Sequence, residues 1–400
     1  MYHIDEDNGK EKYTLIVPAT LDFHFPFLKY MFWSKEYKVE ILENTEDIVD
    51  TGLAYANNEM CFPFILMVGQ VIKTLQSREG EVARTRLLVP TAGDACRGAC
   101  YIGLLAKALK KAGYEECKVI TLNVRHVEEE INMKISLDMA FRGMAGMFYG
   151  DILMLLSNQV RPYEQEAGST EKALAKWKKK VTDDLKSGKN LSPKAVKNNL
   201  KLICEDFKKI QVRNVKRQKI SLVGEFYAKY CALGNWDVVK YMEDRECEVH
   251  VNGISWYALY YIDTHMPDNK GIEQKAFKFV RGLISDMQDY MIECMRDAGF
   301  HSMDNLDCIK EMSKEFVSQN FKIGDGWLLG AEVIGSIQSG FNKVLCVAPF
   351  GCMPNACCGR GLYPYLQRCF PDAYISSVET DASGSKGNYY NRVEMLIHAK

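Results

Sequence analysis

Short apolar runs of strand length alternate with longer amphipathic runs in the first third of the chain. TLIVPA, VEILE, RLLVP and CKVITLN have the length and composition of strands. Helical patterns separate them: FPFLKYMFW, a run that starts at Cys61, and YIGLLAKALKKAG, which ends at Gly113. Alternation of this kind is typical of a parallel sheet with helices on both faces, and it predicts an α/β fold.

The pattern then becomes helical and rich in lysine, with KALAKWKKK and KAVKNNLKLICEDFKKI. Few aromatic residues lie between these lysines, which favours a solvated helix face over a nucleic-acid surface. Strands resume near Ile220 with ISLVGEFYA, and the chain closes with VLCVA, the loop PFGCMPNACCGRG, the helix LYPYLQRCF and the strand YISSVET. We therefore expect two Rossmann-like parallel-sheet domains with a helical, basic bridge, divided as 1–135, 136–219 and 220–400.

The charge balance excludes some classes of partner. Lys and Arg number 51 and Asp and Glu 52, so the net charge of -1 gives no reason to expect binding to nucleic acid or to an acidic membrane. No apolar run approaches the roughly 18 residues that span a bilayer, and the N-terminal MYHIDEDNGKEKY does not resemble a signal peptide. We expect a cytoplasmic protein.

The chain has 14 cysteines, which in the cytoplasm stay reduced and serve as core residues, metal ligands or nucleophiles. Eight lie within or beside predicted strands and helices and are expected to fill the core: Cys117, Cys204, Cys231, Cys247, Cys294, Cys308, Cys346 and Cys369. Six lie where predicted strands end and helices begin: Cys61, Cys96, Cys100, Cys352, Cys357 and Cys358.

The position of these six cysteines indicates a shared site. Ligands bind at the carboxyl edge of an open α/β sheet, where loops far apart in sequence converge. Helix N-termini there favour thiolates over thiols. The spacing lacks the paired CxxC of structural zinc sites and the cysteine run of ferredoxins, so a metal or cluster site and structural thiols both stay open.

Six segments resemble one known family: NNEMCFPFILMVGQ, TAGDACRGACYIGLLAKALKKAG, YGDILMLLSNQVRPYE, LVGEFYAK, GDGWLLGAE and PFGCMPN. Together they are similar to the 2-hydroxyacyl-CoA dehydratase-related proteins, specifically the stand-alone chains described as acyl-CoA dehydratase activase-related. The resemblance runs in the same order over nearly the whole chain. It implies that Cys61, Cys96 and Cys352 hold a [4Fe-4S] cluster in which one iron has no cysteine ligand.

Cys100, Cys357 and Cys358 depart from the pattern expected in this family. Three further thiols would allow a double-cubane [8Fe-9S] cluster, which the superfamily also contains. In that case the chain between the adjacent pair must be non-helical, with the helix beginning at or after Cys358, because neighbouring helical side chains diverge by about 100°. The alternative is that Cys100 faces the core and the adjacent pair has no role.

Three charged residues are weaker candidates for a role beside the cluster. Glu225 and Glu332 could polarise a bound ligand, although carboxylates in such places more often cap helices or fix loops. Arg97 could pair with sulfide or a CoA phosphate, and a surface salt bridge is the alternative.

The resemblance implies a function in low-potential chemistry. The chain has neither GxxxxGK[ST] nor GxGxxG, so ATP would have to act through a separate ATP-hydrolysing activase. We expect a homodimer that works under anaerobic conditions as an ATP-activated low-potential reductase or electron carrier. Radical dehydration of a 2-hydroxyacyl-CoA is the alternative reaction, and a non-catalytic interaction protein with structural cysteines is the alternative class.

Overall fold

The computed structural model describes residues 13–34, 37–57, 59–78, 80–90, 96–122, 136–266 and 271–399. The polar N-terminus, the loop 91–95 before Cys96 and the boundary expected at residue 135 lie outside the described residues.

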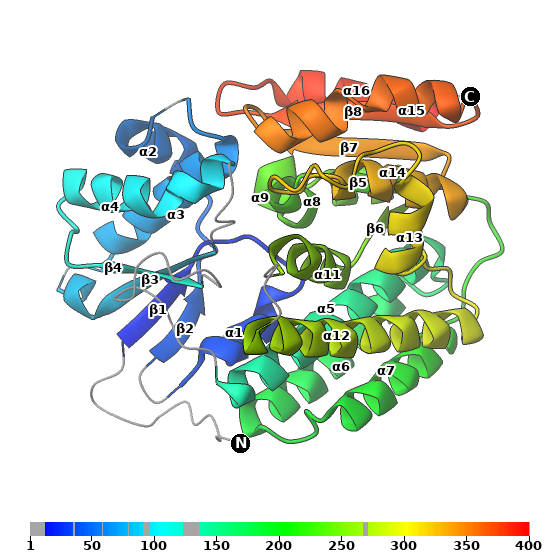
Figure 1. The fold of residues 1–400 in the computed structure, drawn as a ribbon, viewed down its shortest axis with the longest axis horizontal. Coiled ribbons are helices and arrows are strands. Elements are labelled where there is room, and N and C mark those ends of the chain that lie inside the picture. The colour runs from blue at the N-terminus through cyan, green and yellow to red at the C-terminus, as the bar shows by residue number, and fades with distance from the viewer. Residues whose placement is uncertain are drawn as a thin grey trace.

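Two separate four-stranded sheets organise the described part of the chain (Figure 1). The first contains β1 (Tyr13–Val17), β2 (Tyr37–Ile41), β3 (Thr85–Pro90) and β4 (Lys118–Leu122). The second contains β5 (Gln218–Gly224), β6 (Cys247–Val251), β7 (Lys343–Pro349) and β8 (Tyr374–Thr380). The spatial orders are β2-β1-β3-β4 and β6-β5-β7-β8, every pairing is parallel, and the two sheets therefore share one topology. The expected α/β fold with two Rossmann-like sheets is confirmed.

Helices of the first domain connect its strands. They are α1 (Phe25–Phe32), α2 (Ile48–Tyr55), α3 (Phe62–Gln76), the 3₁₀ helices η1 (Val82–Arg84) and η2 (Arg97–Cys100), and α4 (Tyr101–Lys111).

The segment between the sheets is helical, as the pattern predicts. It contains α5 (Leu137–Val160), η3 (Arg161–Tyr163), α6 (Ser169–Ser187) and α7 (Pro193–Lys208). Ser136 and Ser192 cap α5 and α7, because each side-chain oxygen accepts a hydrogen bond from the backbone N–H three residues later.

Helices of the second domain are more numerous than the sequence pattern indicates. They are α8 (Phe226–Tyr230), α9 (Ala232–Asn235), α10 (Val238–Glu243), α11 (Ile254–His265), α12 (Ile272–Asp297), α13 (Leu306–Ser313), α14 (Leu328–Gln338), the π-helix η4 (Asn355–Arg360), α15 (Tyr363–Cys369) and α16 (Lys386–His398). The strand expected over ISLVGEFYA ends at Gly224, because Glu225 begins α8.

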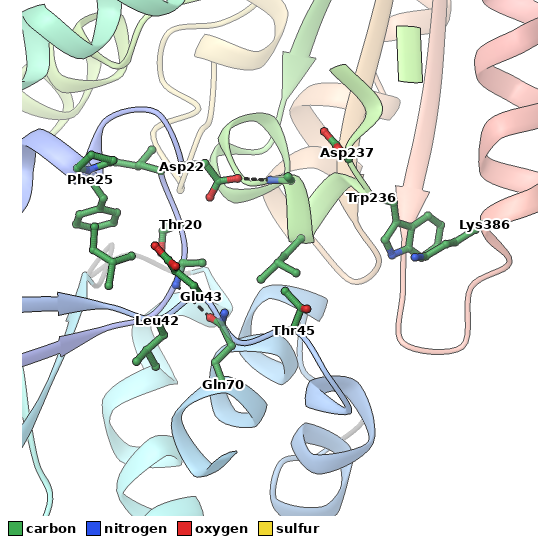
Figure 2. A pocket seen from close by; sticks show the side chains of 16 residues that line it. Thr20, Asp22, Phe25, Leu42, Glu43, Thr45, Gln70, Trp236, Asp237 and Lys386 are labelled. Carbon is green, nitrogen blue, oxygen red and sulfur yellow. Dashed lines mark hydrogen bonds between the residues drawn. The ribbon is translucent and has the colours of Figure 1, made fainter. Parts of the chain in front are cut away.

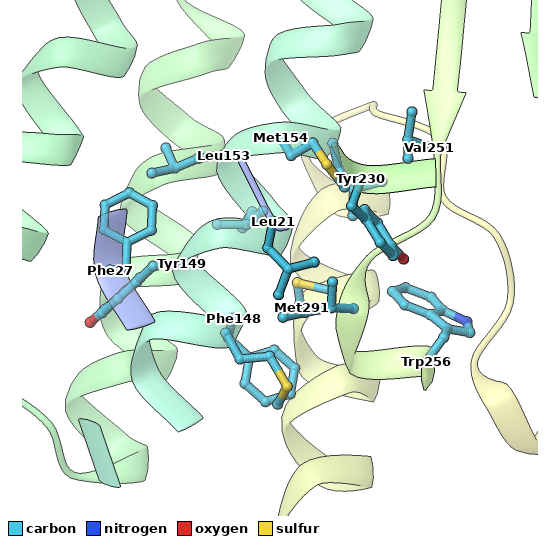
Figure 3. Close-up of a cluster of buried hydrophobic side chains, with 14 of the residues drawn as sticks. Leu21, Phe27, Phe148, Tyr149, Leu153, Met154, Tyr230, Val251, Trp256 and Met291 are labelled. Carbon is cyan, nitrogen blue, oxygen red and sulfur yellow. The ribbon is translucent and has the colours of Figure 1, made fainter. Parts of the chain in front are cut away.

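One hydrophobic core joins the first sheet, the helical segment and the second sheet. Figure 3 shows Phe148 and Leu153 of α5 between Phe27 of α1 and Trp256 of α11, with Tyr149 beside Phe27. Leu153, Phe148 and Trp256 have no solvent-exposed surface. Helix α5 is therefore the central element of the core.

Helix α5 also bears on the expectation that no segment could span a membrane. By length and composition alone, Leu137–Tyr163 is apolar enough to cross a bilayer, so that expectation is wrong for this stretch. Within the protein 72% of the apolar window is buried, as in a core helix of a soluble fold.

Candidate functional site

Three of the predicted site cysteines lie at the start of a helix. Cys61 is the N-cap of α3 and has an extended backbone, and Cys96 is the N-cap of η2, directly before α4. The Gly98 N–H donates a hydrogen bond to Cys96 Sγ at 3.2 Å. Cys352 precedes the helical turn that leads into η4, and its carbonyl accepts from Ala356 N–H at 3.0 Å. Each thiol therefore lies at a positively polarised helix end.

The fold brings these three thiols together, although they are distant in sequence. Burial raises the pKa of each thiol, that of Cys96 to about 12. A negative charge on Cys61 raises the pKa of Cys96 further, and a charge on Cys96 acts in the same way on Cys352. The surroundings of Gly324 support this placement, because a Cβ added there would lie 3.6 Å from Cβ of Cys96 and 2.7 Å from Cγ of Pro354, two residues after Cys352.

The shared topology of the two sheets explains this arrangement. Cys96 follows β3 and Cys352 follows β7, and each of these is the third strand of its sheet along the chain. Cys61 begins the helix that precedes β3. In the second domain the loop into the corresponding helix, α14, carries Asp325. Cys96 in the first domain thus corresponds to Cys352 in the second. Asp325 lies at the position that corresponds to Cys61.

Two carboxylates lie beside the thiols. Glu225 is the N-cap of α8, and its Oε2 accepts a hydrogen bond from Ala228 N–H at 2.8 Å. This is the capping role that the sequence left open, but the charge of Glu225 also raises the pKa of all three thiols.

Asp325, 7% exposed, was not among the candidates from the sequence. Burial holds its pKa well above the usual range, and the Glu225 charge adds to this effect. The signal that could have indicated Asp325 is the GDG sequence itself. Both flanking glycines, Gly324 and Gly326, have positive φ angles of 54° and 41°, which favour glycine on either side of the aspartate.

Glu332 lies in the interior of α14 rather than at a cap or loop. Its two oxygens accept hydrogen bonds from Lys229 Nζ at 2.7 and 2.9 Å, and both side chains are almost fully buried. The pair neutralises its own charge within the core, so Glu332 is a structural partner of Lys229.

Arg97 connects two of the cysteine loops, and among the described residues it forms no ion pair. Its Nη1 donates to the carbonyl of Glu59, two residues before Cys61. The same guanidinium lies against Gly351, where an added Cβ would be 3.0 Å from Nη1, and Gly351 directly precedes Cys352. A single side chain thus holds the loops of Cys61 and Cys352 against the loop of Cys96.

The helix over residues 353–360 does not give the non-helical loop that a double cluster with both Cys357 and Cys358 requires. Cys100 and Cys357 are exposed, whereas Cys358 is buried. Residues 353–360 are helical, so the helix does not begin at or after Cys358, as it would have to if Cys357 and Cys358 both faced one cluster. Because adjacent side chains diverge around a helix axis, Cys357 and Cys358 point in different directions.

The remaining eight cysteines mostly follow the prediction of a core role. Six are buried, Cys369 is half-buried and Cys308 is exposed, so only the assignment of Cys308 to the core is wrong.

A cavity of about 490 Å³ lies between the domains, apart from the cysteines (Figure 2). Phe25, Leu42 and Gln70 line it from the first domain, and Trp236 and Lys386 from the second. No cysteine lines this cavity.

No protein-family model matches the chain, and no curated protein is significantly similar to it. The family indicated by the sequence motifs therefore stays a prediction, and function has to be argued from the site.

Proposed function

We propose that Cys61, Cys96 and Cys352 hold a [4Fe-4S] cluster and that the chain is an ATP-activated low-potential reductase or electron carrier. The observation that carries this proposal is the convergence of the buried thiol of Cys61 and the half-buried thiols of Cys96 and Cys352, each at a helix N-terminus and two of them after a parallel strand. The resemblance of the motifs around the same three cysteines supports it independently.

The chemistry of the donor set fits a metal centre. In a desolvated space the charge of Glu225 raises the pKa of all three thiols and of Asp325, and the charge of Asp325 raises the pKa of Cys96 and Cys352. A cationic metal centre relieves this repulsion and stabilises the thiolates. Among the described residues, no three such side chains surround the position of a single ion. In a cube-shaped cluster each thiolate would bind a different iron, so the three thiols need not surround one ion.

The same surroundings support a low reduction potential. When bound, the cluster would supply one-electron chemistry, and the net charge around a cluster is one of the factors that set its potential. Burial raises the pKa of Glu225 and Asp325, and the same desolvation disfavours the charge of an added electron. A strong reductant is therefore needed, which an activase driven by ATP hydrolysis would provide.

An exposed apolar surface supports docking of such a protein partner. Phe350 and Met353, on either side of Cys352, are 57% and 40% exposed, and Phe321 and Ile323 in the neighbouring loop are 51% and 41% exposed. Apolar side chains gathered in this way at a site favour contact with another protein.

The first test of the proposal is the metal content of wild-type protein. Protein purified without oxygen is expected to contain about four iron and about four acid-labile sulfide atoms per chain, and to give an electron paramagnetic resonance signal after reduction. Protein that contains neither iron nor sulfide would contradict the proposal and favour the interaction protein with structural cysteines.

Arg97→Ala is expected to speed the loss of iron to a chelator several-fold, because the loops of Cys61 and Cys352 lose the side chain that joins them. Arg97→Lys should give partial protection, since lysine keeps the charge but not the planar fork. The matched control is Arg84→Ala, which removes an exposed arginine from η1. Iron loss at the wild-type rate in Arg97→Ala would rule out this bridging role.

A further inference from the structure

Tyr101 makes a direct contact with one of the three cysteines. It is the first residue of α4, and its Oη lies 2.8 Å from Sγ of Cys61, the N-cap of α3. The Tyr101 ring packs on Phe64 of α3 with 4.9 Å between ring centroids. Phe64 is 1% exposed and belongs to the core of the first domain. Packing of the ring against Phe64 therefore fixes the position of the Tyr101 hydroxyl beside Cys61.

The direction of this hydrogen bond follows from the chemistry of a metal-bound cysteine. A cysteine that ligates iron is a thiolate and has no proton to donate. The proton between the two atoms then belongs to the phenol, so Tyr101 Oη donates and Cys61 Sγ accepts. Hydrogen bonds to a charged acceptor are stronger than neutral ones, and exclusion of water strengthens them further.

We propose that Tyr101 is a positioning residue that sets the reduction potential of the cluster through its hydrogen bond to Cys61 Sγ. This inference rests on the proposed iron–sulfur function. Hydrogen bonds to the ligand sulfurs are among the factors that tune cluster potentials. The reduced cluster places more negative charge on its sulfurs than the oxidised cluster, so a donor stabilises the reduced state more and raises the potential.

The hydrogen bond from Tyr101 can be removed by mutation more directly than the other hydrogen bond to a site cysteine. The bond to Cys96 Sγ comes from the backbone N–H of Gly98, which a side-chain substitution cannot remove. Tyr101→Phe removes a single oxygen atom and keeps the ring on Phe64. The matched control is Tyr290→Phe on α12, which removes a phenol beside Cys294, a cysteine not assigned to the cluster.

The experiment is redox titration of the anaerobic protein, followed by its electron paramagnetic resonance signal. Tyr101→Phe should keep the wild-type iron and sulfide content but shift the reduction equilibrium about tenfold toward the oxidised cluster, which is about 59 mV for a one-electron couple. Tyr290→Phe should titrate as the wild type does. An unchanged potential in an iron-loaded Tyr101→Phe protein would overturn the inference.

A second variant keeps the inference testable if Tyr101→Phe fails to hold its cluster. Phe64→Leu removes the ring on which Tyr101 packs, and it is expected to lower the potential in the same direction by a smaller amount. A wild-type potential in this variant would then overturn the inference. Absence of iron from the wild-type protein is a different result, because it would contradict the proposed function itself.

Discussion

Cys61→Ala, Cys96→Ala and Cys352→Ala are each expected to reduce the iron content from about four atoms per chain to less than one. Each thiol provides one of only three cysteine bonds to the proposed cluster, so loss of one leaves two. The fold should survive, since these side chains lie at the sheet edge and not within the strands. The measurements are iron and sulfide content together with the far-ultraviolet circular dichroism of each variant.

The matched controls are Cys100→Ser, Cys357→Ser and Cys358→Ser, which lie within a few residues of the proposed ligands. Cys100 and Cys357 are exposed, and the helix over 353–360 directs Cys357 and Cys358 apart. All three controls should therefore retain about four irons. About eight irons in the wild type, halved by a control substitution, would instead establish a double cluster. Full iron in all three alanine variants would remove Cys61, Cys96 and Cys352 as ligands.

The architecture was largely predictable because burial leaves a strong local signal. The strands near Leu15, Leu87 and Ile220 are buried on both faces and read as continuous apolar runs. Short helices such as α9 and α13 were missed because one or two turns carry too little periodicity to stand out. Helix α11 was missed for a different reason, since ISWYALYYIDTH is apolar around much of its circumference and lacks a polar stripe.

The candidate site was predictable only where topology determines it. Parallel strands end at one edge, so cysteines placed after β3 and β7 had to lie at the edges of their sheets. Which side chains meet across the two domains depends on packing between distant segments, and the Tyr101–Cys61 contact has no local signature. Arg97 shows the same limit, because its partners are backbone groups 38 residues before it and in a loop far along the chain.

Asp151 of α5 joins the three parts of the fold through a single buried carboxylate. Its side chain has no exposed surface, and Oδ1 lies 2.8 Å from Nε2 of His24, at the start of α1. The same carboxylate accepts hydrogen bonds from the N–H groups of Ile254 at 2.7 Å and Ser255 at 3.0 Å. It therefore caps α11 from a different helix. Gly150 permits this approach, because a Cβ there would lie 2.2 Å from the His24 ring.

Asp151→Ala is expected to reduce the free energy of unfolding by about 3–5 kcal/mol, the usual consequence of removing one partner from a buried pair. The imidazole of His24 and the N–H groups of Ile254 and Ser255 would then be buried without an acceptor, and water cannot replace the carboxylate in a closed core. Urea denaturation followed by circular dichroism measures the change. The control is Asp286→Ala, since Asp286 is 68% exposed and pairs with Lys197 on the surface, where little change is expected. Equal stability losses in the two variants would show that the Asp151 network does not hold the domains together. A large loss confined to Asp151→Ala would mean that the facing sheet edges, and with them the geometry of the three cysteines, depend on a polar contact within the helical core.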